Sequence, residues 1–490
     1  MNGGITSGGG IARRAATWVG ALVAGAFMRV TVLLGANIVM ARLMLPEDFG
    51  LAGLANSIAI LLAVLTGGMP FAEVLAQRKV LKRQHLETAT AVSFAGSALA
   101  LALMALAALA IGPVFGDARF WPLLLVASLV VFPQTVQTIL VAYLRRRRAF
   151  QAMARANLAG ALAGSAVAVA LAFLGAGPWA IVVMRCVMLV VEAGVLVATA
   201  RLLVVPRFSG ARLAEMRHYS MFTFMQRVAT ESAYFVINYT VAAFFSVAAV
   251  GQFNMALRLT EPLRGLFRGI AHNTAFEFMR AKAQDQADFP ARFALIISVA
   301  TATIAPVFLG LAAISGALFA IVAGPGWDEA AEIAVFIAIG TSVLLPFDLV
   351  ATAFNARSVP AYLVGQRVIG LGALVLGLGV AVTLGFAGIG AGLARLVADL
   401  AESLWAARAM LTRLHVSLRG AVTGFLVPWG AAAVMGLAVA LFLDALGGEA
   451  AGALAMFAAV GLGVALYLAL AAVLMPQLRR AGVDAVRRRG

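Results

Sequence analysis

The stretch "GQFNMALRLTEPLRGLFRGI", residues 251–270, places charged side chains at helical spacing in an apolar part of the chain. At about 100° per residue, its charged residues fall on one helix face about 120° wide: Arg258, Glu261, Arg264 and Arg268. Guanidinium groups bind phosphate and carboxylate oxygens through paired hydrogen bonds. The spacing therefore predicts binding either to an anion or to carboxylates on other helices.

Other apolar segments carry charges in similar patterns. Arg227 and Glu231 are four residues apart, a spacing at which helical side chains pair, and Arg29 stands near the middle of its segment with no acid within a turn. Further segments contain Arg185 with Glu192, Asp348, and Arg395 with Asp399 and Glu402. One interpretation is that Arg227–Glu231, Arg395–Asp399 and Arg185–Glu192 are buried ion pairs.

The arginines near residue 260 favour a second interpretation. One neighbouring acid, Glu261, does not neutralise three arginines, so excess positive charge is expected inside the first, seventh and eighth apolar segments. A mid-membrane arginine that faces lipid costs about 2.5 to 3.5 kcal/mol, so these groups should face water or anions. The candidate ligands of a phosphate or pyrophosphate group are Arg29, Arg227, Arg258, Arg264 and Arg268. Three intramembrane acids are candidates for coupling to H⁺ or Na⁺: Glu231, Asp399 and Glu402.

The elements that must position these residues are membrane helices. Of 490 residues, 63% are hydrophobic and 12% are charged, against about 25% charged in a typical soluble domain. Apolar runs long enough to cross a core about 30 Å thick recur along the chain. The sequence predicts an all-α polytopic membrane protein with fourteen spans: 16–40, 51–75, 88–112, 120–143, 153–175, 178–200, 219–246, 252–278, 293–323, 331–354, 361–385, 388–411, 420–443 and 451–475.

The distribution of basic residues predicts the orientation of these spans. With the N-terminus in the cytoplasm, 25 of the 37 Lys and Arg residues lie in cytoplasmic segments, whereas only Arg42 and Arg119 lie in outside loops. Both termini are therefore expected in the cytoplasm. The net charge of +16 is explained by this asymmetry and by attraction to anionic lipid, so no nucleic-acid partner is expected.

A weak internal repeat predicts the domain organisation. "MLPEDFGLAGLAN" (44–56) and "SVAAVGQFNMALR" (246–258) both place a short loop and a glycine, Gly50 or Gly251, before a helix. The offset of about 200 residues spans six helices, an even number. The sequence thus predicts an N-lobe (1–205), a C-lobe (206–412) and two added helices with a basic tail (413–490), with a binding site between the lobes near the midplane.

Several functional classes lack their signatures. Cys186 is the only cysteine, and the four histidines show no metal-ligand spacing. The chain contains no nucleotide-binding motif, no nucleophile elbow and no loop longer than about 20 residues that could form a catalytic domain. Neither an enzyme activity nor a metal or cofactor is expected.

Four segments resemble the bacterial polysaccharide transporters, which are lipid-linked oligosaccharide flippases of the multidrug/oligosaccharidyl-lipid/polysaccharide superfamily. They are "ARLMLPEDFGLAGLA" (41–55), "AYLRRRRAF" (142–150), "LAFLGAGPWAIV" (171–182) and "VGQFNMALRL" (250–259). The resemblance covers about the first 280 residues. The last segment has Phe253 where the family usually has Tyr, and the second helix lacks the arginine found in relatives.

The resemblance implies a V-shaped, two-lobed fold that works by alternating access in the bacterial inner membrane. It implies an undecaprenyl-pyrophosphate-linked repeat unit of O-antigen, capsule or exopolysaccharide as the passenger, with membrane lipids, a polysaccharide polymerase and export machinery as candidate partners. It places cavity arginines in the first and eighth helices, where Arg29, Arg258, Arg264 and Arg268 lie.

Other functions remain open from the sequence. A multidrug or cation exporter of the same superfamily would need acids in the N-lobe, where Glu192 is accompanied by Arg29 and Arg185. A polymerase or ligase would need a large outside loop. A non-transporting component of a polysaccharide assembly complex would leave the precursor reaching the outer leaflet when the protein is deleted.

Overall fold

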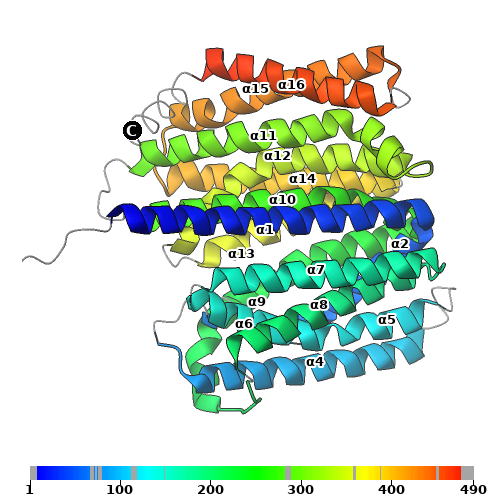
Figure 1. The fold of residues 1–490 in the computed structure, drawn as a ribbon, viewed down its shortest axis with the longest axis vertical. Coiled ribbons are helices and arrows are strands. Elements are labelled where there is room, and N and C mark those ends of the chain that lie inside the picture. Colours follow the sequence, from blue (N-terminus) through cyan, green and yellow to red (C-terminus); the bar gives the residue numbers. More distant parts are fainter. Residues whose placement is uncertain are drawn as a thin grey trace, which may run out of the picture. The chain divides into compact units, whose positions relative to one another are not determined.

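The computed structural model describes residues 8–66, 71, 74–75, 80–111, 119–147, 149–202, 204–281, 289–356, 360–386, 388–448 and 452–475. These residues form α-helices and no β-strand (Figure 1), which confirms the predicted all-α fold. The helices are α1 (Gly8–Leu43), α2 (Pro46–Leu65), α4 (Arg83–Ile111), α5 (Phe120–Leu129), α6 (Val131–Arg146), α7 (Phe150–Phe173), α8 (Pro178–Ala200), α9 (Gly210–Phe244), α10 (Val247–Ala281), α11 (Phe289–Val322), α12 (Asp328–Ala356), α13 (Pro360–Leu384), α14 (Gly388–Thr412), α15 (Leu418–Ala445) and α16 (Gly452–Leu474).

The predicted spans coincide with these helices. Within the described residues, ten segments are long and apolar enough to cross a membrane, and α5 and α6 together make one of them. The other four long helices, α1, α9, α10 and α14, each carry several charged residues. Each of the fourteen predicted spans thus overlaps one helix or, for 120–143, two consecutive helices. The chain is a multi-pass membrane protein. The predicted basic tail lies outside the described residues.

The chain forms two compact units. Unit 1 comprises Met1–Leu43 and Ala55–Glu231, and unit 2 comprises Met44–Leu54 and Ser232–Gly490. The lobe boundaries proposed from the sequence stay a prediction, and two features of the units differ from them. The division falls inside α9 after Glu231, and α2 is shared because its first nine residues belong to unit 2.

Small residues allow close helix packing in unit 1. α7 packs against both α1 and α8, and α4 packs against α5 and α6. A Cβ added to Gly164 of α7 would lie 2.8 Å from the carbonyl oxygen of Met184 in α8. Such small-residue contacts let membrane helices approach closely where lipid provides no hydrophobic drive between them. α8 begins with Pro178, a residue suited to the first helical position because its missing N–H would be unpaired there.

Unit 2 is built around α11 and α12. α12 packs against α10, α11 and α14, and α13 packs against α14. The two C-terminal helices also belong to this unit: α15 and α16 pack against α11 and each other. The hydroxyl of Tyr467 in α16 donates a 2.8 Å hydrogen bond to the carbonyl oxygen of Ala302 in α11.

The start of α2 contacts the start of α10 without intervening side chains. A Cβ on Gly50 would overlap the carbonyl oxygen of Val247, and a Cβ on Gly251 would overlap that of Pro46. The two contacts are equivalent under one shift, since both 50 to 251 and 46 to 247 are offsets of 201 positions. The two glycines of the sequence repeat are therefore the residues at which the repeated helix starts touch.

Side chains extend this contact between the first turns of α2 and the rest of unit 2. The ring of Phe49 lies edge-on to Trp327, with centroids 5.1 Å apart, and Trp327 is buried. Asn238 of α9 donates to the carbonyl oxygen of Gly53 and accepts a 3.1 Å hydrogen bond from Asn254. α2 is thus held to α9, to α10 and to the residue before α12.

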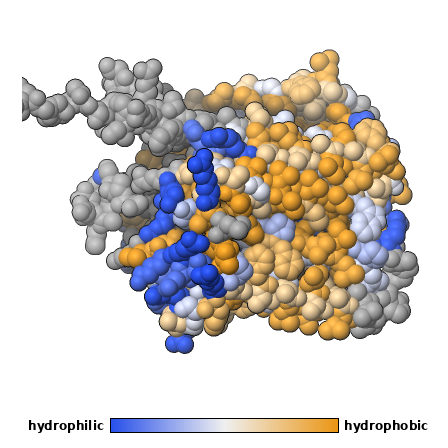
Figure 2. All heavy atoms as spheres, turned by 60° about the horizontal axis from the view of Figure 1, so that its bottom comes forward, coloured by the Kyte–Doolittle hydropathy of each residue, from blue (hydrophilic) through white to orange (hydrophobic). Residues whose placement is uncertain are grey.

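One face of the molecule is mainly apolar, with hydrophilic residues gathered at one end (Figure 2). In unit 1 that end contains the start of α4, the end of α6 and the start of α9. Hydrogen bonds join α4 to α9: Nε2 of buried His85 lies 2.9 Å from Glu215, and Arg212 donates to Gln84. Exposed basic residues there include Lys82, Arg83, Arg145, Arg146, Arg147, Arg207 and Arg217. They lie in segments that the positive-inside rule assigns to the cytoplasm, and that orientation stays a prediction.

Candidate functional site

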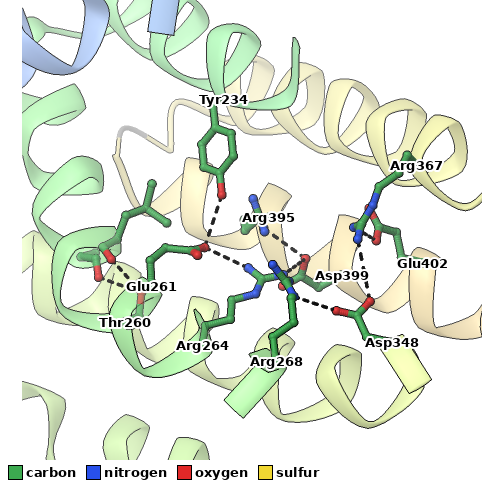
Figure 3. Close-up of polar contacts among 12 residues, drawn as sticks. Tyr234, Thr260, Glu261, Arg264, Arg268, Asp348, Arg367, Arg395, Asp399 and Glu402 are labelled. Carbon is green, nitrogen blue, oxygen red and sulfur yellow. Dashed lines mark hydrogen bonds and ion pairs between the residues drawn. The ribbon is translucent and has the colours of Figure 1, made fainter. Parts of the chain in front are cut away.

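The charged face of α10 contacts acids from two other helices (Figure 3). Arg264 is buried, and its Nη1 donates a 3.2 Å hydrogen bond to Glu261 one turn earlier. Its Nη2 lies 3.8 Å from Asp399 of α14, which also accepts a 3.1 Å hydrogen bond from Arg395. Tyr234 of α9 donates a 3.3 Å hydrogen bond to Glu261 and lies beneath the guanidinium of Arg395.

The second half of this network joins α10, α12, α13 and α14 (Figure 3). Nε of Arg268 donates a 3.1 Å hydrogen bond to Asp348, whose other oxygen lies 3.8 Å from Arg367 of α13. Arg367 also donates to Glu402. Arg268 differs from Arg264 in that 42% of its side chain is exposed.

Glycines on neighbouring helices make room for these carboxylates. A Cβ on Gly340 of α12 would lie 3.0 Å from an oxygen of Asp399, and one on Gly370 of α13 would overlap Glu402. The acids are therefore placed by backbone packing as well as by their arginine partners.

The network is balanced in charge, which corrects the expectation of excess positive charge around α10. Four arginines (Arg264, Arg268, Arg367 and Arg395) face four acids (Glu261, Asp348, Asp399 and Glu402), and each arginine donates at least one hydrogen bond to an acid. The sequence argument considered only acids within a turn on the same helix. The missing negative charge comes from α12 and α14, which lie about 80 or more positions away in the chain.

Arg258 contacts a residue of α2. Its guanidinium lies 5.3 Å from the ring centroid of Phe49, in the first turns of α2. That geometry is a cation–π contact. Arg258 therefore shares a helix face with Arg264 and Arg268 but has different surroundings.

The charged groups inside unit 1 are paired more loosely. Arg29 of α1 lies 3.9 Å from Glu192 of α8, and its buried Nε has no hydrogen-bond partner among the described residues. Glu192 is itself buried, packs over Gly160, and accepts a 3.1 Å hydrogen bond from Gln137. The Arg29 side chain is 37% exposed.

Two further arginines of unit 1 differ in their partners. Nε of Arg227 lies 3.2 Å from Glu231, which confirms the pair predicted from their spacing, and 47% of the Arg227 side chain is exposed. The suggested pair Arg185–Glu192 is not present: within the described residues no carboxylate lies at ion-pair distance from Arg185, because Glu192 faces Arg29 instead.

The sequence reasoning missed Tyr234 and Arg367 as members of the charged network. Arg367 stands in an apolar span without a nearby acid, and that isolation was the available signal that it pairs with another helix. Among the described residues, no group of His, Cys, Asp and Glu is arranged to hold a metal ion.

This chain is similar to known proteins both in sequence and in fold. The sequence model of a family described as "Polysaccharide biosynthesis protein" matches residues 39–332. The succinoglycan biosynthesis transport protein ExoT of Rhizobium meliloti (strain 1021) is 24% identical over 315 residues, or 63% of this chain. The match spans 62% of that relative's length, which is less than two thirds.

Two solved structures show the same fold at low identity. The lipid II flippase MurJ in an inward closed conformation has a TM-score of 0.71 at 14% identity, covering 93% of this chain and 99% of MurJ. An inward-facing multidrug resistance MATE transporter of the MOP superfamily has a TM-score of 0.54 at 16% identity, covering 80% of this chain and 99% of the transporter.

Proposed function

Because this chain belongs to the polysaccharide biosynthesis protein family and has the fold of the MOP superfamily, we propose that it flips lipid-linked oligosaccharides across the bacterial inner membrane. The passenger is an undecaprenyl-pyrophosphate-linked repeat unit of an exopolysaccharide, a capsule or O-antigen. Alternating access of the two lobes moves its polar head while the polyprenyl tail stays in lipid. Membrane lipids, a polymerase and export machinery are the proposed partners.

The observation that carries this proposal is the half-exposed, loosely paired Arg29 within a membrane helix. Its guanidinium has one long ion pair and a buried Nε without a hydrogen-bond partner among the described residues. A fully paired arginine would add only to stability, whereas an arginine with unused donors fits binding of an anionic headgroup. A diphosphate provides both the charge and the oxygen atoms.

The five arginines predicted from the sequence stay our proposed ligands, and their contacts order them by availability. Arg29 and Arg227 are half-exposed, and each has one carboxylate partner. Arg258 contacts Phe49. Arg264 and Arg268 bind the headgroup only if phosphate oxygens replace carboxylate oxygens, which favours Arg268 because it is partly exposed.

The proposal is tested by binding of purified protein to undecaprenyl pyrophosphate, with undecaprenol as the matched neutral lipid. We expect saturable binding of the pyrophosphate and at least about tenfold weaker binding of the alcohol, since the diphosphate makes the contacts with arginine. Equal binding of both lipids, or of neither, would contradict the proposal. Movement of a labelled polyprenyl-pyrophosphate glycan across proteoliposomes then tests transport itself.

We further propose Glu231, Asp399 and Glu402 as coupling residues for H⁺ or Na⁺. Each is paired with an arginine, so a cation must compete with Arg227, Arg395 or Arg367 for its carboxylate. Transport in proteoliposomes should then respond to a pH or Na⁺ gradient, and Glu402→Gln should reduce that response. Equal transport rates with and without both gradients would remove ion coupling from the proposal.

A further inference from the structure

The charged side chains within the membrane helices of the two units differ in their partners. In unit 2, the four arginines of the network match its four acids and hydrogen-bond to them, and Arg258 lies against Phe49. In unit 1, the corresponding arginines are Arg29, Arg185 and Arg227, and their acids are Glu192 and Glu231. Each acid of unit 1 has another arginine as its partner, so no carboxylate among the described residues lies at ion-pair distance from Arg185.

Arg185 lies on α8, two helical turns before Glu192 and on the same face, since seven residues return nearly to the starting direction. It is partly buried, and no carboxylate among the described residues lies at ion-pair distance from it. Of the other titratable groups, Glu231 acts on it most strongly, followed by Cys186 and then Arg227. Glu231 also pairs with Arg227 at 3.2 Å, so its one negative charge is shared by two arginines.

An unpaired guanidinium inside a membrane helix is costly, so it is expected to have a charged partner at some stage of the protein's work. Two other arginines of unit 1, Arg29 of α1 and Arg227 of α9, are both half-exposed and each has one carboxylate partner. Arg227 acts on Arg185 electrostatically, and Arg29 pairs with Glu192 on the same helix as Arg185. The guanidinium group of arginine is planar and can donate two parallel N–H hydrogen bonds, which suits it to two oxygens of one phosphate group.

We propose that Arg185 is the principal phosphate-binding residue of this protein, with Arg29 of α1 and Arg227 of α9 as the other arginine ligands in unit 1. The inference rests on the proposed function, because it identifies the site for the pyrophosphate of the same passenger. It assigns the principal phosphate contact to unit 1.

The test compares Arg185→Gln with Arg155→Gln, an exposed arginine of the neighbouring helix α7. Binding of undecaprenyl pyrophosphate to purified protein is measured for both, with inorganic pyrophosphate as competitor. We expect the dissociation constant to rise about tenfold or more for Arg185→Gln, equivalent to ~1.4 kcal/mol or more, and to stay within about twofold for Arg155→Gln. Arg185→Lys, which keeps the charge but loses the paired donors, should fall between wild type and Arg185→Gln.

The unfolding midpoint of each variant separates binding from folding. Arg185→Gln should be at least as stable as wild type, because it leaves no carboxylate without a partner. If Arg185→Gln binds the lipid as tightly as wild type does, the assignment to Arg185 is wrong, while the proposed function stays in place. If Arg155→Gln also loses binding, the assignment to Arg185 is wrong, and general surface charge explains the binding instead. Absence of binding by the wild type would instead count against the proposed function. If Arg185→Gln does not fold, the ratio of Arg185→Lys to wild type decides.

Discussion

Replacing Arg264 by Gln is expected to lower the unfolding free energy by about 3 to 5 kcal/mol, the cost typical of removing one partner of a buried ion pair. Arg264 is buried and lies between Glu261 and Asp399, so its loss leaves Asp399 with Arg395 alone and Glu261 with no arginine at ion-pair distance among the described residues. The measurement is the apparent midpoint of heat-induced unfolding of detergent-solubilised protein, in which size-exclusion chromatography reports the folded fraction that remains after heating.

Arg408→Gln is the matched control, because Arg408 is an exposed arginine near the end of α14. A combined variant, Arg264→Met with Glu261→Gln, should recover part of the lost stability, because it removes the carboxylate that Arg264→Gln leaves without its arginine and keeps the Arg395–Asp399 pair. An Arg264→Gln protein as stable as Arg408→Gln would show that the network contributes little to the fold.

Replacing Gly251 by Ala is expected to reduce the yield of folded protein sharply. The new methyl group would overlap the carbonyl oxygen of Pro46, and a backbone atom cannot rotate away as a flexible side chain can. Overpacking costs about 1 to 3 kcal/mol where side chains adjust, and this contact offers no such adjustment. Yield and unfolding midpoint measured in the same detergent report the effect, and Gly50→Ala should behave in the same way.

Gly265→Ala provides the control on the same helix, since nothing lies within 4 Å of the added Cβ. That change should be neutral or slightly stabilising, because Ala has the higher helix propensity. If Gly251→Ala and Gly265→Ala gave equal yields, the close approach of α2 and α10 would not be required for folding.

The helices were predictable because their signal is local. Apolar runs of about twenty residues fix where a membrane helix lies, and the structure has a helix or helix pair at every predicted span. Helical spacing also predicted the pairs Arg227–Glu231 and Arg395–Asp399, whose partners are four residues apart. Such pairs can be predicted without knowing which helices are neighbours.

The partners from other helices were not predictable in the same way. Asp348 and Asp399 are about 80 and 135 positions from the arginines of α10 that they face, and only the packing of α10, α12 and α14 brings them together. For the same reason, Arg29 rather than Arg185 is the partner of Glu192. The five proposed ligands and the three proposed coupling acids remain predictions that binding and transport measurements test.

Because α2 contributes residues to both units, the gene cannot be cut once to give two fragments that each encode one complete unit. A fragment that began near residue 206 would lack Pro46–Leu54, and the backbone of Val247, the amide of Asn254 and the ring of Trp327 would lose the contacts those residues supply. Split-protein complementation should therefore succeed only when the N-terminal fragment contributes this short helix start in trans. The two halves suggested by an even six-helix repeat are, in that sense, not autonomous folding modules.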